Sequence, residues 1–336
     1  QNPPPGMHRY MSNAGYPETR AAVAAYLAAR SGLPVTADHV VMTCGAGGAL
    51  NVILKTLLNA GEEVVVVAPY FVEYGFYVEN HGGRTAVAES DARFQLDLEA
   101  LARVITPRTR ALIINSPNNP TGAVYPAEAL AALDELLRAK EAAYSTEIYV
   151  ISDEPYAKLV YDGVEVPPVF TALRRSLIAT SHSKDLGLAG ERIGYAAVNP
   201  AIPDAAEIFA GMVFANRVLG YVNAPALMQR LVGPLQDKAV GLESYRERRD
   251  LLYAHLTGLG FDLVKPAGAF YLFPKCPLPD DVAFAQMAAK RGLLVVPGSG
   301  FGRPGYFRLA YCVPKEMILR SLPVFTDLAR ELGMAH

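Results

Sequence analysis

Short apolar runs rich in β-branched residues alternate with stretches of helical periodicity through the first two thirds of this chain. Alternation of this kind is typical of an α/β fold, in which helices cross over the faces of a mostly parallel sheet. The runs that we predict to be strands lie at residues 40–43, 63–68, 110–115, 147–152 and 176–181.

Helix signals lie before and between these runs. Pro17 fits the first position of a helix, and Gly32 is a suitable C-terminal stop. The segment 126–140 predicts another helix, whose apolar stripe is formed by Ala127, Leu130, Leu133 and Leu137.

The pattern changes after about residue 235. A long charged helix is followed by short apolar runs, and a last helix follows Pro314, which together predict a separate, smaller α+β lobe. The helix is expected over 243–260, and the short strands around 261–264, 269–273, 293–296 and 306–311.

The composition excludes several classes of protein. With 336 residues, 51% of them hydrophobic, the chain can form one large or two medium domains. A net charge of −2 gives no basic field for nucleic acid, and no apolar run reaches the ~18–20 residues that span a membrane. The three cysteines have neither metal-ligand spacing nor a disulfide framework, so we predict no metal site and a cytoplasmic location. The first residues, QNPPPGMHRYM, lack the features of a targeting signal, and we expect a truncated or partly ordered N-terminus.

Three residues outline a site for pyridoxal phosphate (PLP). Lys184 lies in SHSKDLGLAGERIGY, and Asp153 and Tyr156 lie upstream in SDEPY, directly after an apolar run. A lysine amine can form a Schiff base with the cofactor's aldehyde, a carboxylate keeps the pyridine nitrogen protonated, and a phenol binds the ring oxygen. Each residue alone also fits a plainer role, such as a surface lysine or a helix cap, so the prediction depends on their combination.

Two further motifs offer groups for a phosphate. Gly45–Gly48 lie between a predicted strand and a helix, where backbone N–H groups can point at an anion. Ser181, Ser183 and Arg192 flank Lys184 and supply hydroxyls and a guanidinium that suit a phosphate dianion. A glycine-rich turn also serves plain packing, and this one matches neither a dinucleotide fingerprint nor a P-loop.

The remaining candidates suit a substrate that carries a carboxylate. Asn119 lies in NSPNNPTG at the end of a predicted strand, and its amide can bind both a phenolate oxygen and a carboxylate. Arg308 lies within an apolar strand pattern and can hold an α-carboxylate through two parallel hydrogen bonds. The plainer alternatives are a turn without a function and a charge at a strand edge.

The motifs NSPNNPTG, SDEPY, SHSKDLGLAGERIGY and FRLAY, in this order and spacing, closely resemble the class I/II aminotransferases of PLP fold type I, which resemble aspartate aminotransferase. The resemblance covers nearly the whole chain from Tyr10 onward. It implies a large PLP-binding domain over 36–234, with a mostly parallel sheet, and a smaller α+β domain made of 1–35 and 235–336.

The resemblance also implies a role for each site residue. Lys184, Asp153 and Tyr156 are the implied catalytic residues, binding the cofactor's aldehyde, pyridine nitrogen and ring oxygen. Phe71 is expected to stack on the ring, and Tyr10 to reach the phosphate of the neighbouring subunit, which implies a homodimer with sites at its interface. The other implied contacts are Asn119 to the ring oxygen, Ser181, Ser183, Arg192 and the backbone of Ala46 and Gly47 to the phosphate, and Arg308 to the substrate carboxylate.

Two features depart from the family pattern. The family usually carries an N-terminal segment that closes over the substrate, and almost nothing here precedes Tyr10. One aspartate-using subgroup has a lysine for the distal carboxylate in the glycine-rich loop, where this chain has Gly47. The second departure argues against that mode of recognising dicarboxylic substrates.

We therefore expect a PLP-dependent aminotransferase that moves an amino group between an L-amino acid and a 2-oxo acid by a ping-pong mechanism. A C–S lyase or a decarboxylase of the same fold is an alternative, although such lyases more often carry His where this chain has Asn118. A PLP-sensing regulatory module is a further alternative, but no basic helix-turn-helix segment is visible. Aromatic, dicarboxylic and small apolar amino acids all fit the motifs, because specificity depends on the shape of the pocket.

Overall fold

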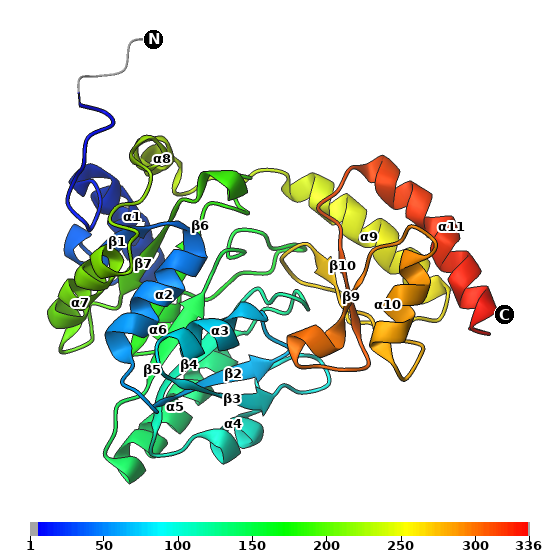
Figure 1. The fold of residues 1–336 in the computed structure, drawn as a ribbon, viewed down its shortest axis with the longest axis horizontal. Coiled ribbons are helices and arrows are strands. Elements are labelled where there is room, and N and C mark those ends of the chain that lie inside the picture. Colours follow the sequence, from blue (N-terminus) through cyan, green and yellow to red (C-terminus); the bar gives the residue numbers. More distant parts are fainter. Residues whose placement is uncertain (1–5, 335–336) are drawn as a thin grey trace.

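A computed structural model describes residues 6–334, which form two lobes, each with its own sheet (Figure 1). The large sheet has seven strands in the order β1-β7-β6-β5-β4-β2-β3, and all neighbours are parallel except those of β7. Its strands are β1 Val40–Thr43, β2 Glu63–Ala68, β3 Arg84–Glu89, β4 Thr109–Asn115, β5 Tyr149–Asp153, β6 Ser176–Ser181 and β7 Gly194–Val198.

The predicted mostly parallel sheet is confirmed, and the five predicted strands match β1, β2, β4, β5 and β6 within two residues at either end. Two strands were not predicted. Strand β3 lies at an edge of the sheet and is mostly not buried, and β7 has the sequence GYAAV, which contains a single β-branched residue. Both therefore lack the continuous β-branched run that marks a buried parallel strand.

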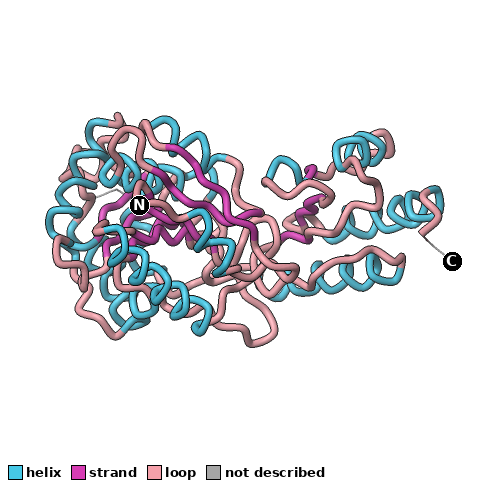
Figure 2. The backbone as a smooth tube through the Cα atoms, turned by 90° about the horizontal axis from the view of Figure 1, so that it is seen from below, coloured by secondary structure: helices cyan, strands magenta, loops and turns pink. Residues whose placement is uncertain are grey.

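Helices cover both faces of the large sheet, and Figure 2 shows the strands between two helical layers. In β2, Val65 and Val67 face one core and Val64 and Val66 face the other, as the two-residue period of a strand requires. The first core receives α1 Pro17–Ser31, α4 Leu98–Val104, α5 Ala127–Tyr144, α6 Val169–Ala172 and α8 Ala226–Val232, and the second receives α2 Gly45–Leu57, α3 Glu73–Asn80 and α7 Ala205–Val218.

Two of the helix predictions can be compared directly with the structure. Helix α1 begins at Pro17 and stops at Gly32, whose φ of 70° is readily adopted by glycine, so both predicted ends are confirmed. The helix predicted over 126–140 extends to Tyr144. Its predicted stripe is wrong at Ala127, which is exposed in the first turn, whereas Leu130, Leu133 and Leu137 are buried.

The small lobe contains three short antiparallel strands and three helices among the described residues. The strand predicted around 261–264 is wrong, because these residues are not in a strand, and the other three predicted strands are shorter than expected. Aromatic side chains such as Phe284, Phe307 and Phe325 fill the core between sheet and helices. The elements are β8 Tyr271–Leu272, β9 Val296–Pro297, β10 Phe307–Ala310, α9 Leu242–Gly258, α10 Asp281–Ala289 and α11 Lys315–Glu331.

The division into domains at residues 36–234, with 1–35 and 235–336 forming the other domain, stays a proposal. Val23, Ala24 and Leu27 of α1 belong to the core cluster of the large sheet. We therefore propose that the large domain also includes α1.

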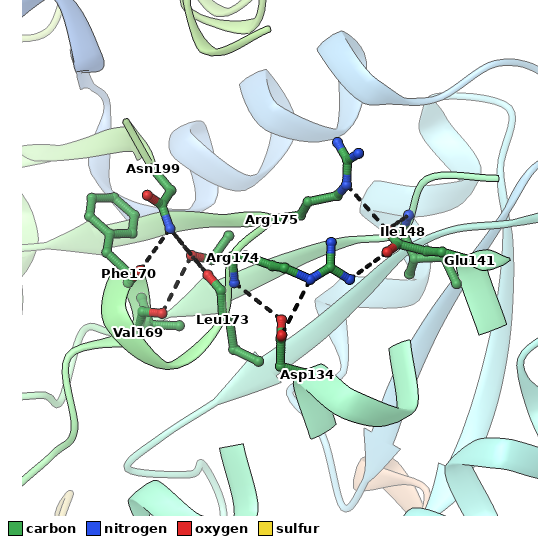
Figure 3. Close-up of polar contacts among 10 residues, drawn as sticks. Asp134, Glu141, Ile148, Val169, Phe170, Leu173, Arg174, Arg175 and Asn199 are labelled. Carbon is green, nitrogen blue, oxygen red and sulfur yellow. Dashed lines mark hydrogen bonds and ion pairs between the residues drawn. The ribbon is translucent and has the colours of Figure 1, made fainter. Parts of the chain in front are cut away.

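A polar network holds β5 and β6 of the large sheet at the ends where these two strands begin (Figure 3). The Arg174 guanidinium contacts Glu141 and Asp134 of α5, at 2.5 and 3.3 Å, and Glu141 also accepts a hydrogen bond from the Ile148 backbone. Nearby, the Asn199 side chain donates to two carbonyl oxygens before β6. Because both strands are anchored where they begin, the paired strands also end close together, at Asp153 in β5 and Ser181 in β6.

Candidate active site

The predicted site motifs meet at the carboxyl edge of the large sheet. Strands β4, β5 and β6 are neighbours in the sheet, and they end at Asn115, Asp153 and Ser181. Open sheets of this kind place their ligands at this edge, because the loops that follow parallel strands converge there.

Asp153 ends β5 and is 5% exposed. Its Oδ2 accepts a hydrogen bond of 2.5 Å from the Tyr74 hydroxyl, whereas its Oδ1 is buried and has no hydrogen-bond partner among residues 6–334. Burial raises the pKa of this carboxyl to about 7, although the bond from Tyr74 opposes the rise. A buried, unpaired carboxylate oxygen is costly, and a positively charged donor such as a protonated pyridine nitrogen would satisfy it.

Asn115 connects this carboxylate to the Asn-Pro motif. Its side-chain amide donates to the Asp153 carbonyl oxygen at 2.8 Å, and its Oδ1 accepts from the Asn119 backbone N–H at 2.6 Å. Asn119 is thereby held at a fixed place beside the end of β5. Sequence reasoning singled out neither Asn115 nor Tyr74, although a polar residue at the end of an apolar strand could have indicated Asn115.

Lys184 follows β6 and is half-buried. Its Nζ lies 5.5 Å from the centroid of the Phe270 ring. Its pKa is lowered chiefly by burial, and further by the positive charges of Arg192 and Arg308, although Cys312 opposes the shift. The positive charges of one arginine from each lobe therefore favour the neutral amine of Lys184.

The N-terminus of α2 is formed mainly by glycines, which let other groups approach its backbone closely. A Cβ on Gly45 would lie 2.8 Å from Nη2 of Arg192, and one on Gly47 would lie 3.1 Å from the Tyr77 hydroxyl. The exposed Arg192 guanidinium thus lies directly against the start of the helix, where the backbone dipoles also favour negative charge. Ser181 and Ser183 are buried in the segment that carries Lys184.

Arg308 reaches this edge from β10 of the small lobe. Its Nη1 donates to Oδ1 of Asn119 at 2.9 Å, and its guanidinium carbon lies 4.7 and 4.8 Å from the centroids of the Tyr271 and Phe301 rings. The Tyr271 hydroxyl is 2.9 Å from that of Tyr156. The structure therefore brings the predicted carboxylate ligand, the Asn-Pro motif and the SDEPY motif together.

Phe71 and Tyr10 are placed differently from each other. Phe71 precedes α3 and packs edge-on against Tyr74, with ring centroids 5.6 Å apart, so it lies close to Asp153. Tyr10 is not gathered with the other predicted residues: it is 91% exposed and lines a surface hollow with Tyr221 and Asn223.

Comparison with known proteins gives matches over nearly the whole chain. The pattern of the family described as aminotransferase class I and II matches residues 3–322. The aspartate/prephenate aminotransferase of Thermus thermophilus is 37% identical, over 98% of this chain and 85% of its own.

Solved structures agree with the sequence matches. An amino transferase from Eubacterium rectale superposes with a TM-score of 0.96 at 41% identity, covering 99% of this chain and 84% of the other. The Thermus thermophilus aspartate aminotransferase with maleate gives a TM-score of 0.84 at 34% identity, covering 96% and 84%. The chain therefore belongs to the aminotransferase class I and II family, has the fold of its aspartate aminotransferase neighbours, and is an aminotransferase.

Proposed function

We propose that this aminotransferase uses pyridoxal phosphate to move an amino group between an L-amino acid and a 2-oxo acid, by a ping-pong mechanism. The observation that carries the proposal is the buried Oδ1 of Asp153, which has no partner among residues 6–334 and lies at the sheet edge where Lys184 also lies. When bound, the cofactor supplies an aldehyde that reacts with amines and a pyridinium ring that accepts electrons from the substrate.

Several residues fit the task of holding this cofactor. Asp153 would accept the hydrogen bond of the pyridine nitrogen, Asn119 and Tyr156 would contact the ring oxygen, and Phe71 would cover the ring. The phosphate would be held by Arg192, Ser181, Ser183 and the backbone N–H groups of Ala46 and Gly47 at the start of α2.

Lys184 would move the proton at the substrate Cα. A base must be deprotonated to accept this proton, and burial together with two nearby arginines lowers the pKa of its amine toward the working range. Arg308 would hold the α-carboxylate, and Asn119 would support it, since the two side chains already form a hydrogen bond. All amino and oxo acid substrates share this carboxylate.

The names of the relatives suggest where to begin with substrates. Relatives at 37% and 33% identity are named aspartate/prephenate aminotransferase and aspartate aminotransferase. We propose aspartate as the first amino donor to test, although Gly47 occupies the loop position where one aspartate-using subgroup has a lysine.

We also propose a homodimer with sites at its interface. Large apolar side chains are exposed on two helices of the large lobe, with Phe214 66% and Val218 51% exposed on α7 and Phe76 60% exposed on α3. Exposed apolar side chains of this size are common at protein interfaces. Tyr10, exposed on the same lobe, would complete the partner's phosphate site. A cytoplasmic location is proposed from the three free thiols.

The test of the proposed function is to find where the cofactor is attached. The enzyme would be reconstituted with pyridoxal phosphate, reduced with borohydride, digested and mapped by mass spectrometry. We expect the label on Lys184 and none in Lys184→Ala, with Lys158→Ala, a lysine paired with Asp185, as the control that keeps the label. A label on another lysine would contradict the proposed site, and release of ammonia without transfer of the amino group to an added 2-oxo acid would contradict the proposed reaction.

A further inference from the structure

Among residues 6–334, Tyr74 supplies the side chain that hydrogen-bonds to the Asp153 carboxylate. It lies in the first turn of α3, is 1% exposed, and donates to Oδ2 from a position 79 residues away in the sequence. The same turn follows Phe71, the aromatic side chain proposed to cover the cofactor ring. One short segment therefore carries both the proposed ring cover and the partner of the carboxylate.

The direction of this hydrogen bond is fixed by chemistry. Burial and the neighbouring carboxylate raise the pKa of Tyr74 well above its usual value, so the phenol keeps its proton and acts as the donor. A phenol has one proton to donate, and it goes to Oδ2. This leaves Oδ1 as the oxygen that can accept from a ligand, and it restricts rotation of the carboxylate.

The bond also acts on the charge of Asp153. Burial favours the protonated carboxyl, whereas a donated hydrogen bond favours the carboxylate, which is the form that a pyridinium ring requires. Glu154 is a further ionisable group that acts on this carboxyl, and it opposes ionisation, while the carboxylate adds to the rise that burial causes in the pKa of Tyr77 and Tyr156.

We propose that Tyr74 is a positioning residue of this aminotransferase: its hydroxyl aims Oδ1 of Asp153 at the cofactor's pyridine nitrogen and keeps the carboxylate ionised. The proposal rests on the proposed function, since it assigns a role toward pyridoxal phosphate. It adds a residue that acts through Asp153 and touches neither substrate nor cofactor.

The first experiment titrates Asp153 in the cofactor-free protein. Urea unfolding would be followed by far-ultraviolet circular dichroism between pH 5 and 9, at fixed protein concentration, for wild type, Tyr74→Phe, Asp153→Asn and the double variant. The difference between each protein and its counterpart that also carries Asp153→Asn isolates the titration of Asp153 from that of Glu154. We expect Tyr74→Phe to move this titration upward by about one to two pH units, since a hydrogen bond to a charged group is lost.

The second experiment uses the reconstituted enzyme. Tyr74→Phe should shift the pH dependence of the bound cofactor's absorption band and lower kcat by roughly tenfold, with KM changed by less than about threefold, because the ring is a weaker electron sink. Tyr149→Phe is the matched control, because Tyr149 is a buried tyrosine that likewise hydrogen-bonds to a carboxylate. Its hydroxyl lies 3.2 Å from a carboxylate oxygen of Asp204, and Tyr149 is the first residue of β5, away from the carboxyl end of that strand. It should leave both readouts unchanged.

An unchanged Asp153 titration together with an unchanged absorption band in Tyr74→Phe would overturn the proposal. If Tyr74→Phe does not fold at pH 8, the proposal predicts that the double variant with Asp153→Asn folds there, and a double variant that is equally unfolded would also overturn it. The titration needs no cofactor, so it can fail while the label on Lys184 is found. Absence of that label would contradict the proposed function whatever Tyr74 does.

Discussion

Replacing Arg308 with lysine tests whether this residue binds the α-carboxylate that all substrates share. In the structure the guanidinium makes cation–π contacts with the rings of Tyr271 and Phe301 and donates to Asn119. Lysine keeps the positive charge, but its ammonium cannot make two parallel hydrogen bonds to a carboxylate or stack on an aromatic ring as a planar guanidinium can.

The expected loss can be worked out from these contacts. A charge-assisted hydrogen bond contributes about 1.5–3 kcal/mol, and each cation–π contact about 0.5–1 kcal/mol at a partly exposed site. Lysine recovers part of both, so we expect a net loss of about 2–4 kcal/mol in transition-state binding, or roughly thirtyfold to a thousandfold in kcat/KM. The loss should be similar for every amino donor.

The assay follows the half-reaction of each donor by the absorbance of the bound cofactor, with aspartate, an aromatic and a small apolar amino acid. Arg320→Lys, an exposed arginine on α11 of the same lobe, is the control and should behave as wild type. Cofactor content should be unchanged in both variants. If Arg308→Lys impaired aspartate alone, the residue would read the substrate side chain, and the reasoning would be refuted.

Three other predictions follow from buried or exposed groups of the structure. Burial raises the pKa of Asp153 to about 7 from 3.8, so the stability that this carboxyl contributes is present below pH 4 and is lost as the pH rises through 7. Between pH 5 and 8, the unfolding free energy of the cofactor-free wild type should therefore fall by about 2–3 kcal/mol more than that of Asp153→Asn. Equal losses in urea titrations would contradict this. Phe214→Glu should give monomers in light scattering, whereas Leu294→Glu should stay dimeric, because Leu294 is 85% exposed but lies on the small lobe. The reverse result would show that the interface lies on the small lobe. Arg249→Met should destabilise the protein by about 2–3 kcal/mol, because the fully buried guanidinium pairs with Asp162 and Asp250, which are half-exposed. The exposed Arg246→Met is its control, and similar denaturation midpoints for the two variants would argue against the buried pair.

The sequence by itself determined five of the seven strands of the large sheet and the parts of the site that follow them. The bounds of β1, β2 and β6 coincide with the predicted runs, and β2 contains four consecutive valines, which is the pattern of a parallel strand buried on both faces. Since parallel strands end at one edge, motifs that directly follow β4, β5 and β6 had to converge. This is why Asp153, Asn119 and Lys184 could be placed together before the structure was known.

Only the tertiary structure decided which side chains meet across distant segments. Tyr74 meets Asp153, and Arg308 of the small lobe meets Asn119 from 189 residues away. Neither pair has a local sequence signal, because a hydrogen bond between two elements depends on how the helix packs on the sheet and how the lobes are joined. The same holds for the exposed position of Tyr10. Local periodicity records which face of an element is buried, and the partner of a buried polar group is set by the packing of the whole chain.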